Sequence, residues 1–297
     1  VFWASTSPKL RSLTSLESSM WTCVYTVLPS FGLALAVVCT SGLVRAVLLG
    51  LFIGQMAGLA HDCTHAVTSA RWWVTCLGWG VSHTWFRKDH LAHHRLCNMP
   101  LEDPHFDYTP LFVQSTQERC AANFWSQHLF FPIVILFGRL NIHVTSIVHA
   151  VRHGLLMECL GIVANIVWTT SALQKWLHVL VMHATVGLAV HVPFLLNHYT
   201  HNQYDAEQLD KMTYLERQLR TTINYSASPW WSWMLCGLDL HMEHHAFPHV
   251  PRHKLHTLTP KIKAACKQYG IKYEPRTVCS LAVDCYVKMT SIVDGRT

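Results

Sequence analysis

The stretch LVRAVLLGLFIGQMAGLAHDCTH, residues 43–65, joins a long apolar run directly to two histidines. Residues 43–59 are long and apolar enough to cross a bilayer, since a spanning helix needs roughly 17–25 such residues. His61 and His65 follow at i, i+4 spacing, which places two side chains on one helix face about 5–6 Å apart. The stretch therefore predicts a membrane helix that brings two imidazoles to one metal at a bilayer surface.

The composition indicates that lipid is part of the surroundings of this chain. Apolar residues make up 51% of it and charged residues only 13%, about half the ~25% of a typical soluble domain. The net charge of +6 comes from 23 Lys and Arg residues, which in a membrane protein meet anionic lipid head groups. The sequence contains no stripe of arginines and aromatic residues of the kind that stacks on nucleic-acid bases, so we expect no nucleic-acid partner.

The chain reads as a single domain. No linker, internal repeat or break in composition divides its 297 residues, so we expect one membrane domain over residues 21–297. Residues 1–20 are rich in serine and threonine and are expected to form a flexible N-terminal tail rather than a signal peptide. The eleven cysteines are scattered without a CxxC pair, which favours reduced thiols over a disulfide framework.

Four apolar runs predict an all-α membrane protein with two helical hairpins. The predicted spans cover residues 21–40, 43–59, 155–173 and 176–196. Residues 71–86 are apolar but short and broken by glycines, which predicts a half-helix at the surface. Residues 123–151 are interrupted by Pro132 and Arg139, which favours interfacial helices over a span.

The basic residues predict on which side of the membrane each segment lies. With four spans, the N-terminus, residues 60–154 and residues 197–297 share one side, and only Arg45 and Lys175 fall near the other. The positive-inside rule makes the shared side cytosolic, together with both termini. All histidine clusters lie in these segments, so we expect a cytosolic helical cap that carries the metal site.

Two further histidine clusters share one spacing. Each offers imidazoles at i, i+3 and i+4, which lie on one side of a helix. They are His90, His93 and His94 in HLAHH, and His241, His244 and His245 in HMEHH. With the first pair, eight imidazoles exceed the three or four protein ligands of a zinc site and predict two metal ions with open positions. Imidazole binds Zn, Cu, Fe or Ni, so the ligand type alone leaves the metal open.

Three acidic residues lie inside or beside these clusters, at Asp62, Asp89 and Glu243. Carboxylates next to a metal site commonly accept the second N–H of a ligating histidine, which fixes its tautomer and its orientation. We expect that role for these three side chains, because carboxylates are too few here to form the metal site themselves.

These motifs resemble the membrane fatty-acid desaturases, in particular the front-end and sphingolipid long-chain-base group. The resemblance runs from about residue 55 to 275 and rests on HDCTH, HLAHH with the following Asn98 and Asp103-Pro104, QHLFFP, LLNHY, QLRTTIN and HMEHHAFPHVPRHKL. It implies a four-span fold with a cytosolic site for two iron ions, a reaction with O2, and electrons from cytochrome b5. It also implies residence in the endoplasmic reticulum membrane.

The resemblance assigns individual residues as well. Seven of the histidines named above match histidine positions of the family's boxes, namely His61, His65, His90, His93, His94, His244 and His245. The eighth, His241, stands where front-end enzymes usually carry glutamine, although the wider superfamily commonly carries histidine there. In LLNHY, His198 resembles an additional ligand of the family, with His201 as its competitor, and Asn197 is expected to hold a bridging water or to lie behind the ligands. No HPGG motif of a fused cytochrome b5 domain is present, so we expect that domain upstream of Val1 or a separate donor protein.

The expected reaction is oxygen-dependent desaturation of a fatty acyl chain carried by a lipid or by CoA, with cytochrome b5 and its reductase as partners. The boxes do not separate this reaction from desaturation of a sphingolipid long-chain base, or from hydroxylation or acetylenation on the same scaffold. A zinc-dependent membrane hydrolase or receptor-like protein is the alternative of another class. An apolar channel for the substrate is predicted, with Arg87, Lys88 and Arg95 placed to hold a head group or an acidic cytochrome.

Overall fold

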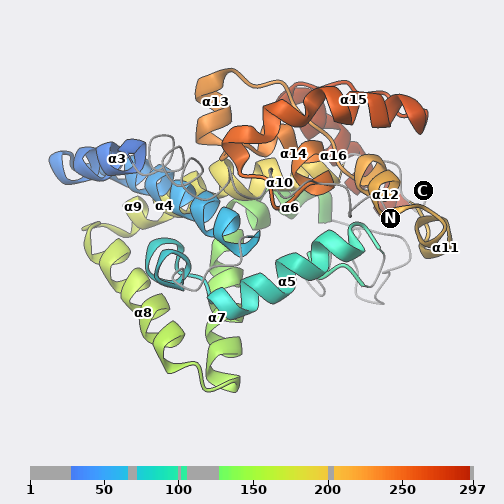
Figure 1. Cartoon of the computed structure of the whole chain (residues 1–297). Coiled ribbons are helices and arrows are strands. Elements are labelled where there is room, and N and C mark those ends of the chain that lie inside the picture. The colour runs from blue at the N-terminus through green and yellow to red at the C-terminus, as the bar shows by residue number, and fades with distance from the viewer. Residues whose placement is uncertain (1–27, 66–71, 100–101, 106–126, 200–203, 295–297) are drawn as a thin grey trace, which may run out of the picture.

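The computed structural model describes residues 28–65, 72–99, 102–105, 127–199 and 204–294 (Figure 1). Within these ranges the regular structure is helical, and the only strand-like pairing is an isolated bridge between Tyr225 and Arg276. The all-α prediction is therefore confirmed for the described part of the chain. The predicted N-terminal tail over residues 1–20 lies outside the described residues.

The first hairpin consists of α3 (Leu28–Cys39) and α4 (Gly42–His65). The chain reverses at Gly42, whose φ of 60° is in the left-handed region that glycine adopts without steric cost. Helix α4 continues beyond the predicted span over residues 43–59, through HDCTH to His65, because no glycine or proline interrupts the helix after Gly58. The first histidine pair therefore lies on the same continuous helix as the apolar run.

The second hairpin consists of α8 (Leu156–Ser171) and a long helix that runs from Trp176 to His198. The long helix is divided into α9 (Trp176–Val186), the π-helical turn η5 (Gly187–His191) and α10 (Val192–His198). Helix α4 packs closely on α9, since a Cβ added at Gly50 would lie 2.6 Å from the Cβ of Thr185. The two long helices therefore reach the same end of the molecule together.

Two helices are long and apolar enough to cross a membrane, namely Gly42–His65 and Trp176–His198. A third candidate is the pair α6 (Gln127–Leu136) and α7 (Gly138–Arg152), which is bent by 68°. The bend falls between the two helices at Phe137, whereas Pro132 lies within α6. The described residues thus supply two or three candidate spans where the sequence predicts four.

The half-helix predicted over residues 71–86 exists as the π-helix η3 (Val74–Trp79), which packs against α4 and α8. Trp73 and Leu77 are exposed, so one side of the segment lies at the surface as predicted, whereas Val74, Cys76 and Trp79 are buried. Its carboxyl-terminal carbonyls are satisfied from other helices: Asn165 Nδ2 donates to Leu77 O at 2.7 Å, and Arg139 Nη2 donates to Trp79 O at 3.1 Å. These side chains provide partners for backbone groups that would otherwise be unsatisfied on the buried side.

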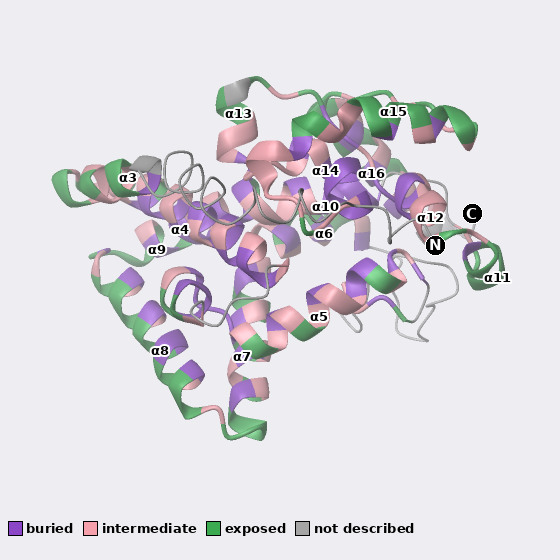
Figure 2. Cartoon of the chain, viewed as in Figure 1, coloured by how far each residue is buried: buried purple, intermediate pink, exposed green. Residues whose placement is uncertain are grey.

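The part of the chain after His198 forms short helices around the end of the long ones (Figure 1). They are α11 (Ala206–Asp210), α12 (Tyr214–Thr221), α13 (Pro229–Met234), η6 (Leu238–Leu240), α14 (His241–Ala246), η7 (Arg252–Leu258), α15 (Thr259–Gln268) and α16 (Val278–Asp294). Exposed large apolar side chains occur on α3, α4, α6–α9, α13 and α16 and at η3 and η5, but none lies between residues 232 and 277. Figure 2 colours α14 mainly as buried and α15 largely as exposed. The segment between residues 232 and 277 therefore has the surface expected of protein in water.

Candidate metal centre

Helix α5 (His83–Leu96) carries the second histidine cluster, and its first turn is held by two polar side chains. Ser82 caps the helix, with its Oγ accepting the Trp85 N–H at 3.1 Å. The buried carboxylate of Glu158, from the start of α8, accepts hydrogen bonds from Ser82 Oγ at 2.5 Å and from the Thr84 N–H at 3.2 Å. The start of α5 is thereby fixed to the membrane hairpin, which sets the position of its histidines.

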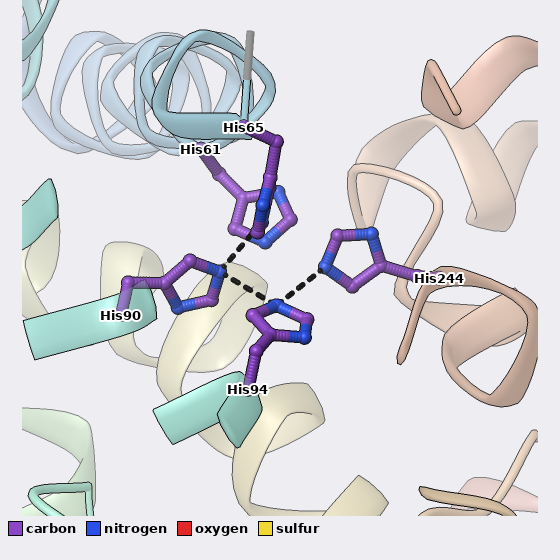
Figure 3. A group of neighbouring side chains, drawn as sticks. All are labelled: His61, His65, His90, His94 and His244. Carbon is purple, nitrogen blue, oxygen red and sulfur yellow. Dashed lines mark hydrogen bonds between the residues drawn. The ribbon is translucent and has the colours of Figure 1, made fainter. Parts of the chain in front are cut away.

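Cluster one, as we call the first group of imidazoles, gathers side chains from three helices (Figure 3). Its members are His61 and His65 from α4, His90 and His94 from α5, and His244 from α14, and their ligand atoms all lie within 4.8 Å of one another. The Nε2 atom of His90 is 2.9 Å from that of His65 and 3.1 Å from that of His94. Nitrogens that each bind one ion at about 2.0–2.1 Å lie roughly 3 Å apart, so this spacing fits a shared metal.

Cluster two lies beside it and consists of His93, His198, His241 and His245. The ligand atoms of His198, His241 and His245 lie within 4.8 Å of one another, and those of His93 and Cys97 lie within 4.8 Å of that of His245. The closest pair is His198 and His241, whose Nε2 atoms are 2.8 Å apart. All nine predicted histidines thus lie in these two groups, and every one from α5 and α14 is buried.

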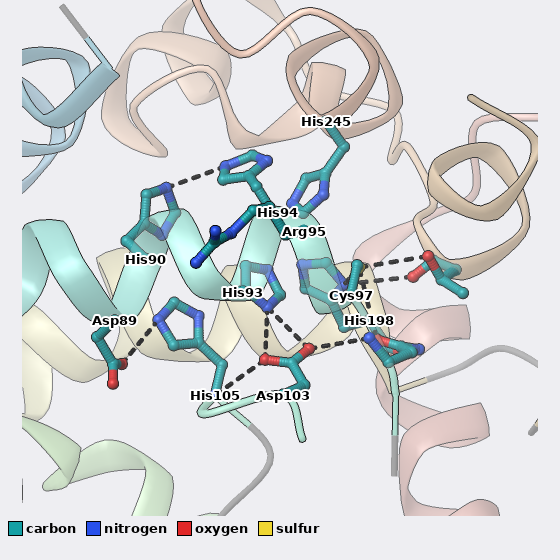
Figure 4. A network of polar contacts seen from close by, with 12 residues as sticks. Asp89, His90, His93, His94, Arg95, Cys97, Asp103, His105, His198 and His245 are labelled. Carbon is teal, nitrogen blue, oxygen red and sulfur yellow. Dashed lines mark hydrogen bonds and ion pairs between the residues drawn. The ribbon is translucent and has the colours of Figure 1, made fainter. Parts of the chain in front are cut away.

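Three of the four members of cluster two are oriented by hydrogen bonds on the far side of their rings, and Figure 4 shows the bond between His93 and Asp103. The His93 Nδ1–H donates to the buried carboxylate of Asp103, with both oxygens at 2.9 Å. The His245 Nδ1–H donates to Gln218 Oε1 at 2.8 Å, and Nδ1 of His198 lies 3.2 Å from the carbonyl of Thr221. These bonds leave the Nε2 side of each ring facing its cluster, which is the tautomer a metal ligand needs.

Burial keeps the histidines of α5 and α14 neutral. Removal from water lowers the pKa of each imidazole well below its ordinary value of about 6.5, and neighbouring imidazoles lower it further. The residues concerned are His90, His93, His94, His241, His244 and His245. Only a neutral imidazole has a lone pair free for a metal, so this environment keeps the groups ready to bind.

Two ring nitrogens provide a direct test of whether these residues fit metal ions. Nε2 of His93 and Nε2 of His245 are buried and have no hydrogen-bond partner among the described residues, although the Nδ1 atoms of both rings have one. A buried polar atom without a partner costs about 1–3 kcal/mol. A cation bound between the rings removes that cost, so the donor set fits metal ligation.

The acidic residues predicted to orient ligands have other partners. Asp62 forms an ion pair with Arg252 at 3.1 Å and lies 3.9 Å from Nδ1 of His61, whereas Asp89 pairs with His105 Nε2 at 3.2 Å. Glu243 is fully buried and accepts hydrogen bonds from Asn224, Thr259 and Tyr273. It therefore fastens α14 to the chain around it, and it makes no hydrogen bond to a histidine among the described residues.

Asn197 and His201 were the other polar residues expected near the ligands. The Asn197 Nδ2 donates to the carbonyl of Leu238 at 2.9 Å, and its Oδ1 is buried without a partner in the described part of the chain. This side chain lies next to His198 in sequence and joins α10 to η6 ahead of the third box. His201 lies outside the described residues.

Four residues near the centre were not predicted as site residues. Asp103 and Gln218 hold ligand rings, Glu158 holds the start of α5, and His105 stacks on His93 with ring centroids 4.2 Å apart. Asp103 and Gln218 fall within stretches on which the family resemblance rests, and this was the one signal that pointed to them. Their contacts join residues 10 and 27 positions apart, which no helical spacing indicates.

A cavity of about 340 Å³ lies against cluster one and falls in the size range of small-molecule sites. His61 and His90 line one side of it, and Trp79, Phe86 and Phe194 supply aromatic walls. Its remaining wall includes polar side chains, namely Asp89, His105, Asn141, Thr145 and His191. The cavity brings an apolar ligand next to imidazoles of the candidate metal centre.

The model of the family "Fatty acid desaturase" matches residues 40–277. The chain belongs to the fatty acid desaturase family. The matched residues include both long helices and all three histidine boxes, so both clusters lie within the region that is similar to the family. No solved structure matches the chain significantly.

Several named desaturases are similar to the chain. "Delta(8)-fatty-acid desaturase 2" of Arabidopsis thaliana is 30% identical, and the match covers 79% of the chain and 61% of that protein. "Delta 8-(E)-sphingolipid desaturase" of Komagataella phaffii is 26% identical over 77% of the chain and 49% of its own length. "Acyl-lipid (9-3)-desaturase" of Borago officinalis is 27% identical over 76% and 58%. The chain thus spans about half to three fifths of the length of these relatives.

Proposed function

We propose that the chain catalyses oxygen-dependent desaturation of a lipid acyl chain at two iron ions held by cluster one and cluster two. The observation that carries the proposal is the convergence of three histidine boxes, distant in sequence, on two adjacent imidazole groups beside a cavity. Membership of the fatty acid desaturase family supports iron as the metal and an acyl chain as the substrate.

Each cluster is assigned the ligands of one ion. Cluster one supplies His61, His65, His90, His94 and His244, and cluster two supplies His93, His198, His241 and His245. When bound, the iron ions supply the redox chemistry that converts two adjacent methylenes into a double bond. For each double bond, one O2, two electrons and two protons are consumed, and the two hydrogens lost by the chain leave with them as two water molecules.

The protein's own contribution is to position the substrate and to exclude water. Methylenes of an alkyl chain are chemically almost equivalent, so the position of the double bond depends on how the chain is held. Trp79, Phe86 and Phe194 form apolar walls that bury the chain, and each buried CH₂ contributes about 0.8 kcal/mol to binding. Asp103 and Gln218 keep the rings of His93 and His245 in fixed orientations while the chain is bound.

The membrane arrangement completes the proposal. We assign four spans at residues 21–40, 43–59, 155–173 and 176–196 within one domain over residues 21–297, with the metal centre and both termini in the cytosol. The exposed apolar side chains of α3, α4, α8 and α9 support contact with lipid, and the apolar-free surface between residues 232 and 277 supports contact with water. The endoplasmic reticulum is the proposed membrane, with cytochrome b5 and its reductase as the electron source.

A sphingolipid long-chain base is the second candidate substrate. The relatives named as Delta 8-(E)-sphingolipid desaturases favour it, since they match about as much of the chain as the fatty-acid desaturases do. Hydroxylation or acetylenation at the same centre gives products of different mass, so lipid analysis separates these reactions from desaturation.

The test is expression of the chain in a host that lacks the product, followed by lipid profiling and metal analysis. We expect a new double bond that requires O2 and a reductant, and about two iron ions per chain. The matched substitutions are His93→Ala, which should abolish the product, and His256→Ala, an exposed histidine whose loss should not. A single zinc ion with no oxygen requirement would contradict the proposal and favour a hydrolase.

A further inference from the structure

The water-facing side of η7 and α15 carries a uniform positive charge. From Arg252 to Tyr273 the sequence contains six basic residues and no acidic one. Four lysines of this segment, at Lys254, Lys261, Lys263 and Lys267, define what we call the α15 basic face. From this face we infer a docking surface for an acidic electron-donor protein, and the inference rests on the proposed function because only a redox centre requires such a donor.

The lysines of the α15 basic face are not neutralised within the chain. Arg252 pairs with Asp62 and Lys272 with Glu274, but no ion pair joins Lys254, Lys261 or Lys267 to an acidic group among the described residues. Lys263 lies 5.2 Å from the ring centroid of Tyr273. Lys263 and Lys267 are four residues apart on one helix, where like charges repel and destabilise it. An acidic partner relieves that repulsion.

The same face lacks the apolar side chains that a bilayer contact needs. Helix α15 buries Ile262 and Cys266 and exposes Lys261, Lys263 and Lys267. A helix that lies in a membrane interface instead presents large apolar residues on its outer side. On α13, by contrast, Trp230 and Trp231 are 77% and 56% exposed. Charge complementarity without an apolar contact surface is typical of transient protein partners. Anionic lipid head groups attract basic residues too, and the lipid arm of the experiment below separates the two occupants.

The α15 basic face is also directly connected to the metal centre. Thr259, the first residue of α15, donates from Oγ1 to Glu243 Oε1 at 2.8 Å, and the Tyr273 hydroxyl donates to the same oxygen at 2.8 Å. Glu243 lies on α14 between His241 and His244. Packed helices have axes about 8–10 Å apart, so a donor on α15 lies one helix layer from the ligands. Each docking event transfers one electron, with the donor oxidised and the bound metal reduced.

The basic residues that the sequence indicated for this role are placed differently. The Arg87 guanidinium donates to the carbonyl of Thr64 at the end of α4, so this side chain already has a partner within the chain. Lys88 is exposed on α5, and no hydrogen bond or ion pair of its side chain to another described residue is present. Arg95 is exposed on α5 as well. The α15 basic face offers four lysines on adjoining elements where α5 offers Lys88 and Arg95, so it is the better docking surface.

The experiment measures reduction of the metal centre by a soluble cytochrome b5 haem domain, an acidic donor, with the full chain in nanodiscs. The variants are Lys261→Glu, Lys263→Glu and Lys267→Glu, singly and together. The control is Lys175→Glu at the α8–α9 connection, which changes the charge by as much as each single variant does. We expect the triple variant to lower the association rate at least about ten-fold at low salt, with the difference shrinking as salt rises. The control should match the unsubstituted protein.

Two further measurements decide the outcome. With dithionite in place of the donor, the variants should form product as the unsubstituted chain does; if they fail there too, the substitutions act on the structure and the docking proposal is overturned. An effect that appears only in nanodiscs with anionic lipid assigns the face to the bilayer and also overturns it. If the unsubstituted chain forms no desaturated product with dithionite, the proposed function fails while donor binding is still measured separately.

Discussion

Cluster one and cluster two consist of the same side chain, yet they are held in different ways. Four of the five rings of cluster one are carried by α4 and α5, and Nδ1 of His90 and of His94 has no hydrogen-bond partner among the described residues. In cluster two, Asp103, Gln218 and the Thr221 carbonyl hold three of the four rings, whereas Nδ1 of His241 has no partner among the described residues. Helix spacing therefore contributes most to the first group, whereas hydrogen bonds from other parts of the chain hold most of the second.

The difference shows two solutions to one problem, which is to keep a ligand ring within a few tenths of an ångström of its metal. His61 and His65 lie on the last turns of α4, whose i, i+4 spacing brings their rings together. In cluster two, His93, His198 and His245 also have hydrogen-bond partners behind their rings, which fix their tautomers. We therefore expect the two clusters to respond differently to substitution.

The largest effect is expected from removing a ligand. His94→Ala should empty cluster one and His245→Ala should empty cluster two, each lowering bound iron from about two ions per chain to about one and activity at least about 100-fold. Iron analysis and product assays on both variants check this. Loss of both ions in either variant would show that the clusters do not bind independently.

A smaller effect should follow from removing one supporting hydrogen bond. Asp103→Asn replaces the buried carboxylate that accepts the His93 Nδ1–H. Loss of such a hydrogen-bond partner behind a ligand ring typically lowers metal affinity or activity about 10–100-fold. Asp89→Asn is the matched control, because Asp89 contacts His105 rather than a predicted ligand. Metal titration of both proteins measures the effect, and equal losses would remove Asp103 from its orienting role.

Acid should weaken the metal-free fold through the buried imidazoles. The unfolded chain binds protons on histidine below about pH 6.5, but the folded α5 and α14 histidines, whose pKa values are lowered by burial, do not. Their stabilising contribution is therefore complete above about pH 6.5 and is lost as the pH falls, by up to about 1.4 kcal/mol per pH unit for each histidine. Thermal unfolding between pH 7.5 and 5.5 measures this fall.

The control for that prediction is the His94→Gln variant, which removes one of the buried imidazoles. Its unfolding temperature should depend less steeply on pH than that of the unsubstituted protein. A midpoint that stays constant down to pH 5.5 in both proteins would contradict the buried, neutral state of these rings.

The smallest effect is expected at the cap of α5. Ser82→Ala removes the oxygen that accepts the Trp85 N–H, which typically costs about 1 kcal/mol of stability. Ser228→Ala removes the corresponding cap of α13, which carries no ligand. Both variants should unfold at slightly lower temperature, but only Ser82→Ala should also lower iron content. An unchanged iron content in Ser82→Ala would show that the start of α5 does not set the ligand positions.

The sequence predicted the helical class, both long helices and eight of the nine histidines that come together, because apolar length and the i, i+3 and i, i+4 spacings are local properties. The ninth, His198, was indicated only by the family resemblance. The sequence did not predict that the histidines of HLAHH divide between the two clusters, with His90 and His94 in cluster one and His93 in cluster two. His93 and His94 are adjacent and therefore point about 100° apart around α5, so they face different clusters although both lie on the same broad side. The partners of these rings, such as Asp103 and Gln218, depend on folding and leave no local pattern.

The unbroken course of α4 fixes the height of the metal centre relative to the lipid. At 1.5 Å per residue, His61 stands about 29 Å along the axis from Gly42, close to the ~30 Å thickness of a hydrocarbon core. With α4 across the bilayer, the helix acts as a ruler between one face of the membrane and the candidate metal centre at the other. If the centre acts as proposed, a thicker or thinner membrane changes the depth from which a substrate chain must rise to react.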